Sequence, residues 1–229
     1  MIFKSFCIII VLFLNIKTTS FANNKVKYVE DIQADIMKIL HNSQDDNRTK
    51  QLIIDKYAKY IDFEWNAKNA LGRYFLDLTD EEKNNYICEY ACFISYSWLP
   101  KLDFQKVKGV KINILNNTIP LNNKFNDENV VIKITLPDGL IYTVNLRIRE
   151  MLDNSFKILN IDVEGVDLAM MYRYQFESLI NSNGNSAKFL LNHLIATNNK
   201  NITKGEFNFK LPPEYKCPTQ KLIDLRHTK

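Results

Sequence analysis

The chain is organised around residues 156–176, which read FKILNIDVEGVDLAMMYRYQF. The first half alternates apolar and polar residues, a pattern typical of a β-strand with one buried face. The alternation changes phase midway, because the apolar residues fall on even numbers up to Ile158 and on odd numbers from Ile161. A β-bulge around Leu159 and Asn160 would produce this change and would curve the strand strongly.

The second half of the same stretch predicts a helix. Gly165 ends the strand, and Asp167 is well placed as the N-cap of the helix. The apolar residues that follow at helical spacing are Leu168, Met171, Tyr172, Phe176 and Leu179. A curved strand therefore runs directly into an amphipathic helix, and the apolar faces of both can point at one interior.

Three further strands are expected before this stretch. Alternation with period two begins near residue 107 and recurs over 130–136 and 140–149. Pro-Asp-Gly at 137–139 predicts a hairpin turn, whereas residues 116–129 are interpreted as a polar loop. The result is four consecutive antiparallel strands with one apolar face that must be covered.

Amphipathic segments on both sides of the strands supply the cover. The segments predicted to be helical are 26–41, 48–60, 62–71, 79–99, 168–183 and a last helix around 189–195. Thr79 and Glu82 form a capping box, and Gly72 suits the position just after a helix. The predicted fold class is α+β, with a curved four-stranded antiparallel sheet covered by amphipathic helices.

Residues 1–22 are interpreted as a secretory signal peptide. Lys4 precedes an apolar run from Phe6 to Leu14, which is well short of the roughly 20 residues that span a bilayer. Ser20 and Ala22 place small residues at the −3 and −1 positions and predict cleavage after Ala22, and no cysteine directly follows this site to carry a lipid anchor. Cleavage lowers the formal net charge from +4 to +2 by removing two lysines. This balance does not favour nucleic acid as a partner.

Three cysteines remain after cleavage, and we expect them to be free, buried thiols. Cys88 and Cys92 lie four residues apart on a predicted helix, which is a poor disulfide geometry, and they lack the partners of a zinc site. The alternative is a bridge from Cys217 to one of them.

Three motifs carry a resemblance to a known family. The first is DVEGV at 162–166 followed by YR at 172–173 and QF at 175–176. The second is YIDF at 60–63 followed by ALGRY at 70–74, and the third is the capping box before an aromatic helix. In this order they resemble the MlaC family of periplasmic phospholipid shuttles, the toluene-tolerance auxiliary proteins of an ABC transporter. The resemblance spans most of residues 26–197.

The resemblance implies a nuclear-transport-factor-like sheet that encloses a lipid pocket in one domain, residues 23–197, followed by a polar tail, 198–229. It also implies a periplasmic phospholipid-binding shuttle, not an enzyme, that needs no metal or cofactor besides phospholipid as cargo. Its partners would be an outer-membrane lipoprotein complex and an inner-membrane MCE-domain protein of an ABC transporter, which together maintain outer-membrane lipid asymmetry. Residues 116–129 and the tail depart from the family and leave partner docking open.

The candidate lipid-binding residues are those that strand parity and helical spacing direct toward the interior. They are Phe63, Leu71, Tyr74, Tyr90, Phe93, Ile132, Ile134, Tyr142, Val144, Ile148, Phe156, Ile158, Val163, Leu168, Met171, Tyr172 and Phe176. Arg173 is added, because it could hold a lipid phosphate through a charge-assisted bond or could instead pair with Glu177 one turn on. Arg73 is expected to be a buried structural cation, with a place near a headgroup as the alternative.

Two other functions stay open. A secreted enzyme of the nuclear-transport-factor-like fold would need a polar group deep in the pocket, but Asp162 and Glu164 are expected to face outward. A protein-interaction module would have a filled core instead of a pocket. A rigid empty lipid cavity would cost a large part of the stability of a domain. The carrier hypothesis therefore predicts a protein that is purified with lipid or partly collapses without it.

Overall fold

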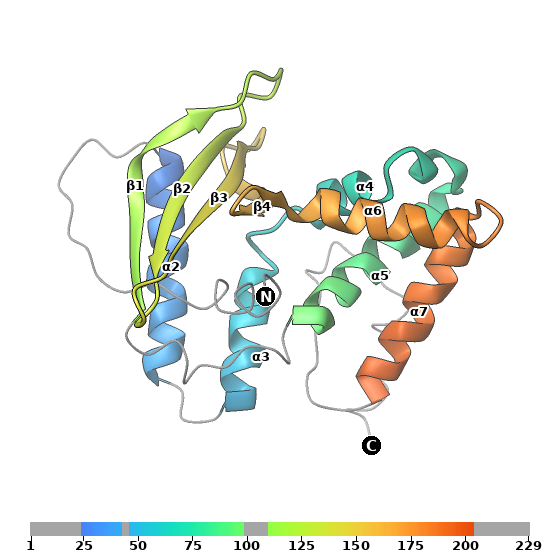
Figure 1. Cartoon of the computed structure of the whole chain (residues 1–229), viewed down its shortest axis with the longest axis horizontal. Helices are drawn as coiled ribbons and strands as arrows, with labels where there is room; N and C mark the ends of the chain where they lie inside the picture. Colours follow the sequence, from blue (N-terminus) through green and yellow to red (C-terminus); the bar gives the residue numbers. More distant parts are fainter. Residues whose placement is uncertain (1–23, 43–45, 99–109, 204–229) are drawn as a thin grey trace. The chain divides into compact units, whose positions relative to one another are not determined.

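The computed structural model describes residues 24–42, 46–98 and 110–203 (Figure 1). The predicted signal peptide lies outside the described residues. The chain divides into two compact units, and the chain passes from one to the other more than once. The first unit is taken from the segments before residue 50 and between residues 101 and 168, and the second from the rest.

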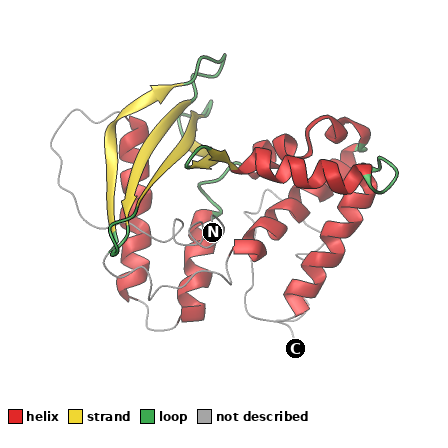
Figure 2. Ribbon diagram, viewed as in Figure 1, coloured by secondary structure: helices red, strands yellow, loops and turns green. Residues whose placement is uncertain are grey.

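The first unit contains helix α2 (Asn24–Asn42) and an antiparallel sheet whose neighbouring strands are consecutive in the chain (Figure 2). The strands are β1 (Lys111–Pro120), β2 (Glu128–Thr135), β3 (Ile141–Glu150), β4 (Phe156–Val163) and β5 (Val166–Asp167). The predicted fold class, α+β with an antiparallel sheet, is confirmed. The two residues of β5 add a fifth strand to the four that were predicted.

Strand β4 contains the bulge that the change of phase predicted. Between consecutive residues of β3, the pairing passes from Asn160 to Ile158. Leu159 is therefore the extra residue of the bulge, and its side chain is fully buried. Because of this slip, Ile158 and Val163 lie on the same face of the sheet despite their opposite parity.

Helix α2 packs against β1 and β2 (Figure 1). The residues that it buries completely or almost completely are Val26, Val29, Ile32 and Ile36. The ring of Tyr28 lies 5.5 Å from that of Phe156, and the ammonium of Lys25 lies 2.5 Å from the carboxylate of Glu128. This helix thus supplies part of the cover that the apolar sheet face requires.

The interpretation of residues 116–129 as a polar loop is wrong. Strand β1 continues into this segment and β2 begins within it, so the loop spans only residues 121–127. The register of β1 against β2 shifts between Ile114 and Thr118. Because β1 is at the edge of the sheet, it tolerates the asparagines and the proline that made the segment look unsuited to a strand.

The two turns predicted from glycine are present. The amide of Gly139 donates to the carbonyl of Leu136 across 2.9 Å, and Gly139 has a φ of 88°. Gly165 lies between β4 and β5 with a φ of 79°. Asp167, predicted to cap the following helix, is the last residue of β5 and directly precedes that helix, which is the N-cap position.

The second unit is helical. Its elements are most of α3 (Asp46–Tyr57), α4 (Phe63–Leu71), the 3-10 helix η1 (Gly72–Asp77), α5 (Asp80–Trp98), α6 (Leu168–Asn181) and α7 (Ala187–Thr203). Helix α7 extends past residue 198, where the polar tail was predicted to begin. Asn198 is fully buried, and its side-chain amide donates to the carboxylate of Glu89 on α5 across 2.7 Å. The polar composition after residue 197 predicted a tail, because the sequence does not show that Asn198 is buried inside a helix.

Two predicted helix starts are confirmed. The carboxylate of Asp62 accepts a bond from the amide of Trp65 across 2.8 Å and caps α4. At α5, the hydroxyl of Thr79 accepts from the amide of Glu82, and the Glu82 carboxylate accepts from the amide of Thr79. The bonds from Thr79, together with Lys188, lower the pKa of Glu82 to about 2.

The expectation of free thiols is confirmed for Cys92 and wrong for Cys88, where a bridge had been left open as the alternative. Cys92 is a free, buried thiol, and burial raises its pKa. Cys88 is disulfide-bonded, and the other half of this disulfide lies outside the described residues. The spacing on the helix argued against a bond between Cys88 and Cys92, and it carried no information about a distant partner.

Candidate functional site

Four of the predicted site residues form an aromatic cluster in the second unit. Tyr90 and Phe93 on α5 face Tyr172 and Phe176 on α6, and each ring of α5 lies 6.0 to 6.2 Å from each ring of α6. Three of these contacts are close to edge-on, which is a favourable geometry for aromatic pairs. The two apolar stripes read from the sequence therefore meet.

Two further rings extend this cluster toward η1. The ring of Tyr86 lies 6.1 Å from that of Tyr90, and the ring of Phe75 lies 6.3 Å from that of Tyr86. Tyr86 is fully buried, and its hydroxyl has no hydrogen-bond partner among the described residues. Burial raises its pKa well above the usual range. Leaving a buried hydroxyl unpaired costs about 1–3 kcal/mol, so this atom is a local source of instability.

Arg173 on α6 lies against Gly72, the residue that ends α4. Gly72 has a φ of 61°, and a Cβ atom built on it would lie 2.8 Å from both Nε and Nη2 of Arg173. Within residues 24–42, 46–98 and 110–203, buried Nε has no hydrogen-bond partner, and Nη1 donates to the sulfur of Met170 across 3.8 Å. No carboxylate of the described residues forms an ion pair with Arg173, so the predicted alternative with Glu177 is not formed.

Tyr74 fixes η1 to α6, and Arg73 is not the buried cation that was predicted. The hydroxyl of Tyr74 donates to the side-chain carbonyl of Asn181 across 2.7 Å. Arg73 is exposed, with its guanidinium over the ring of Tyr74 and a 3.1 Å bond to the Tyr74 hydroxyl. Because Tyr74 is the buried residue of η1, the neighbouring Arg73 faces the solvent.

Eight predicted site residues belong to the sheet, and the strand register places all of them on one face. Six are buried: Ile132, Ile134, Val144, Ile148, Ile158 and Val163. Tyr142 and Phe156 are half-buried. This is the face toward α2, because Phe156 contacts Tyr28 of that helix. Parity corrected for the bulge was sufficient to assign these residues.

A model of the MlaC protein family matches residues 30–195. The chain belongs to the MlaC family. The fold is also similar to a solved structure described as the phospholipid-binding protein from Ralstonia solanacearum in complex with a phospholipid. The TM-score is 0.61 at 18% sequence identity, over 80% of this chain and 99% of that chain. No curated protein matches the chain.

The motifs that resembled MlaC all fall inside the matched range, and the structure gives several of their residues a local role. Phe63 and Leu71 are buried on α4, whereas Leu168 and Met171 at the start of α6 are half-buried. Tyr86 was missed as a site residue, although it belongs to the same helical stripe as Tyr90. Its distinguishing feature, an unpaired buried hydroxyl, depends on its surroundings and leaves no signal in the sequence.

The acidic residues of the DVEGV motif have structural roles. Asp162 accepts hydrogen bonds from the side chain of Asn145 and from the amide of Gly165, each across 3.1 Å. The carboxylate of Glu164 accepts a bond from the amide of Thr143. In the part of the chain that the structure describes, no group of three or more His, Cys, Asp or Glu side chains is arranged to hold a metal ion.

Proposed function

We propose that this MlaC-family protein binds phospholipid in the periplasm and carries it between an outer-membrane lipoprotein complex and an inner-membrane ABC transporter with an MCE-domain subunit. The observation that carries the proposal is the similarity of fold, along nearly the whole of the other chain, to a protein solved with a phospholipid bound. The family match over residues 30–195 supports the same class of function. Such a carrier serves the lipid asymmetry of the outer membrane.

The apolar side chains are assigned to the acyl chains. Within the second unit, this role falls to the aromatic cluster of α5 and α6. Burying one methylene contributes about 0.8 kcal/mol, so two long acyl chains contribute on the order of 20 kcal/mol before the costs of binding. Contacts of this kind are sufficient to keep a phospholipid bound.

Arg173 is assigned to the lipid phosphate. Its guanidinium is positively charged, half-buried and without a carboxylate partner among the described residues. A guanidinium forms short, charge-assisted bonds to phosphate oxygens, and its planar donors suit two oxygens at once. The contact with Gly72 restricts where this charge can lie.

Two features support a periplasmic location. Residues 1–22 have the pattern of a cleaved signal peptide. The disulfide of Cys88 is typical of proteins in oxidising compartments.

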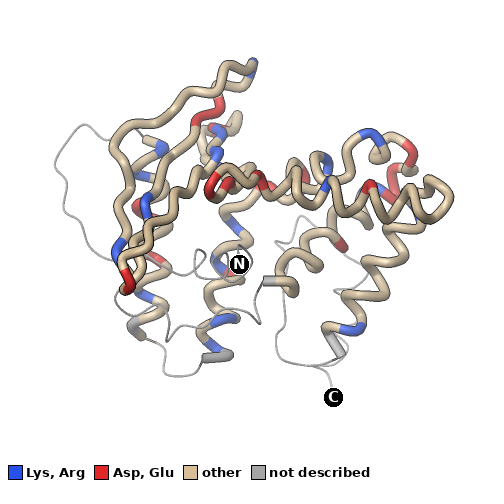
Figure 3. The backbone as a smooth tube through the Cα atoms, in the orientation of Figure 1, with Lys and Arg blue, Asp and Glu red and all other residues tan. Residues whose placement is uncertain are grey.

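None of the described helices is long and apolar enough to cross a membrane. Basic and acidic residues are interspersed along each unit (Figure 3), which does not favour a nucleic-acid partner.

Native mass spectrometry of the purified mature protein, followed by organic extraction, tests the binding step. We expect an additional mass of phospholipid size that is released on denaturation. A protein that has the mass of the bare chain and melts cooperatively would instead support a filled-core interaction module.

Transfer is tested separately from binding. The loaded protein should deliver labelled phospholipid to vesicles containing the inner-membrane transporter complex faster than to empty vesicles. Equal rates would contradict the shuttle role and leave lipid binding intact.

A further inference from the structure

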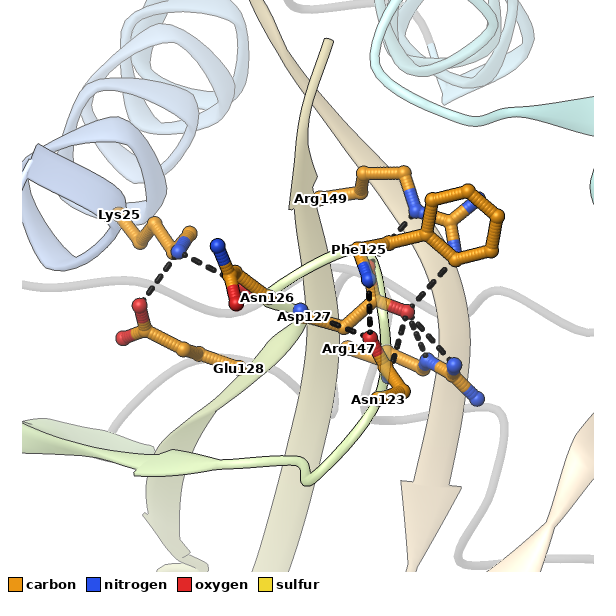
Figure 4. Close-up of polar contacts among 8 residues, drawn as sticks. All are labelled: Lys25, Asn123, Phe125, Asn126, Asp127, Glu128, Arg147 and Arg149. Atoms are coloured by element: carbon orange, nitrogen blue, oxygen red, sulfur yellow. Dashed lines mark hydrogen bonds and ion pairs between the residues drawn. The ribbon is translucent and has the colours of Figure 1, made fainter.

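A buried carboxylate fixes the loop of residues 121–127 on one end of the sheet (Figure 4). Asp127 is fully buried, and Arg147 and Arg149 of β3 donate four hydrogen bonds to its carboxylate at 2.6 to 2.9 Å. Asn123 donates to the same carboxylate across 3.1 Å and accepts a bond from the amide of Phe125. These bonds hold the loop in one conformation.

The fixed loop presents an aromatic ring between two cations. The Phe125 side chain is 49% exposed, and its ring centroid lies 4.0 Å from the guanidinium carbon of Arg149 and 4.8 Å from Nζ of Lys124. Figure 4 shows this ring lying over Arg149. Two other large apolar side chains at the same end of the sheet are exposed: Ile119 at 52%, near the end of β1, and Leu152 at 106%, in the turn between β3 and β4.

These side chains gather at one end because the sheet is an antiparallel meander. Strands β1 and β3 finish where β2 and β4 begin, so the loop of residues 121–127 and the turn of residues 151–155 lie at the same end. We name this end the tip, meaning Ile119, Lys124, Phe125 and Leu152 with Arg149 beneath the ring. All of these residues belong to the first unit.

We propose that the tip inserts into the interfacial region of a lipid bilayer. Aromatic side chains flanked by cations are favoured at the boundary between headgroups and acyl chains. Because Asp127 is buried and paired with two arginines, its charge does not oppose Lys124 at the surface. This inference rests on the proposed function, since a carrier that collects and delivers phospholipid works beside membranes.

The apolar side chains, rather than net charge, carry the contact. Glu150 and Asp153 flank Leu152 and are exposed, so they oppose a strongly anionic surface. Lys124 attracts anionic headgroups in return, whereas the charge of Arg149 is paired with Asp127. We therefore expect binding to neutral bilayers as well, with a modest preference for bilayers that contain anionic lipid.

The shape of the tip favours a bilayer over a protein partner. The exposed apolar side chains protrude from the end of β1, the 121–127 loop and the 151–155 turn, with charged residues between them. A stable protein interface instead buries about 800 Å² on each partner with close complementarity. A bilayer interface accommodates side chains that protrude to different depths.

Cosedimentation with vesicles tests the inference on the full mature protein. The variants are Phe125→Ser with Leu152→Ser at the tip and, as a matched control, Leu140→Ser with Ile141→Ser at the opposite end of the same sheet, where the side chains are 55% and 60% exposed. Vesicles are made of phosphatidylcholine alone or mixed with phosphatidylglycerol. We expect the tip variant to need about tenfold more lipid for half-maximal binding and the control variant to behave like the wild type. Lys124→Glu should abolish the preference for phosphatidylglycerol.

The proposal is overturned if the wild type sediments with neither kind of vesicle, or if both pairs of substitutions weaken binding equally. Thermal melts of each variant confirm that these exposed substitutions leave the fold intact. Extracted phospholipid is measured in the same samples. Protein that contains phospholipid but does not bind vesicles would contradict only the membrane insertion of the tip. Protein that binds vesicles but contains no phospholipid in any sample would contradict the proposed function and leave the insertion of the tip intact.

Discussion

The guanidinium of Arg173 on α6 lies against the α-carbon of Gly72, which ends α4. These residues belong to the two most distinctive motifs of the chain, ALGRY and the YR pair of α6. Gly72 is therefore required twice: once because its φ of 61° is unfavourable for any other residue, and once because a side chain would occupy the space of the guanidinium. Through the second requirement, the residue that ends α4 also determines where the guanidinium of Arg173 lies.

Gly72→Ala separates these requirements when it is compared with Gly184→Ala. Both glycines have a positive φ, but nothing lies within 4 Å of a Cβ built at Gly184. We expect Gly184→Ala to lower the free energy of unfolding by about 1 kcal/mol from backbone strain alone, and Gly72→Ala by about 1–2 kcal/mol, because the end of the Arg173 side chain must also shift. Urea denaturation measures both. Equal losses would show that the Arg173 side chain moves aside at no measurable cost.

Arg173→Met tests the assignment of the lipid phosphate. The substitution keeps much of the apolar stem and removes the charge, so we expect a folded protein that retains phospholipid about tenfold less tightly. Arg173→Lys should restore part of the affinity. The matched control is Arg73→Gln, because Arg73 is exposed and bonded to Tyr74. Phospholipid extracted per mole of protein is the readout, and unchanged retention in Arg173→Met would refute the assignment.

Tyr86→Phe removes a buried hydroxyl that has no hydrogen-bond partner in the part of the chain that the structure describes. We expect the lipid-free protein to keep or gain stability, by up to about 1 kcal/mol, because an unsatisfied group is lost. Tyr74→Phe is the matched control: it removes a 2.7 Å bond to Asn181 and should cost about 1 kcal/mol. Thermal melts of delipidated protein give both values. Clear destabilisation by Tyr86→Phe would mean that the hydroxyl has a partner in solution.

Sequence patterns predicted the features that depend on residues close together in the chain, namely the β-bulge, the helix caps and the buried faces of the helices. The bulge at Leu159 could be predicted because an extra residue shifts the apolar positions of a strand from even to odd numbers. The caps at Asp62 and Thr79 could be predicted because a side-chain oxygen at the N-cap accepts a bond from an amide two or three residues further on. Apolar stripes likewise predicted which residues of α5 and α6 turn inward, and Tyr90 and Tyr172 do meet.

Features that depend on distant segments could not be predicted in this way. The contact of Arg173 with Gly72 joins two helices, and neither motif alone indicates it. The polar half of β1 was missed because an edge strand is stabilised by its neighbour on one side and needs little β propensity of its own. The disulfide of Cys88 depends on a partner remote in sequence, which spacing along a helix does not reveal.

Acid sensitivity is the expected consequence of the buried Asp127 carboxylate. Burial alone would raise its pKa, but the hydrogen bonds and charges of Arg149 and Arg147 outweigh burial and lower the pKa below its usual value. A lowered pKa in the folded state means that the ion pairs contribute stability above the unfolded value of about 3.9, and that this contribution is lost as the pH falls through the folded value. We expect Asp127→Asn to destabilise the protein by on the order of 3 kcal/mol near pH 7, because two arginines lose their shared partner.

The pH dependence makes this prediction specific. The gap in unfolding free energy between the wild type and Asp127→Asn should stay constant from about pH 6 to 8 and narrow below about pH 4. Should Asp127→Asn fail to fold, Arg149→Gln removes one of the two partners and should show a smaller gap with the same narrowing. Urea denaturation at a series of pH values gives these curves. A gap that does not change down to the acid transition would show that Asp127 is not the group whose protonation releases the 121–127 loop.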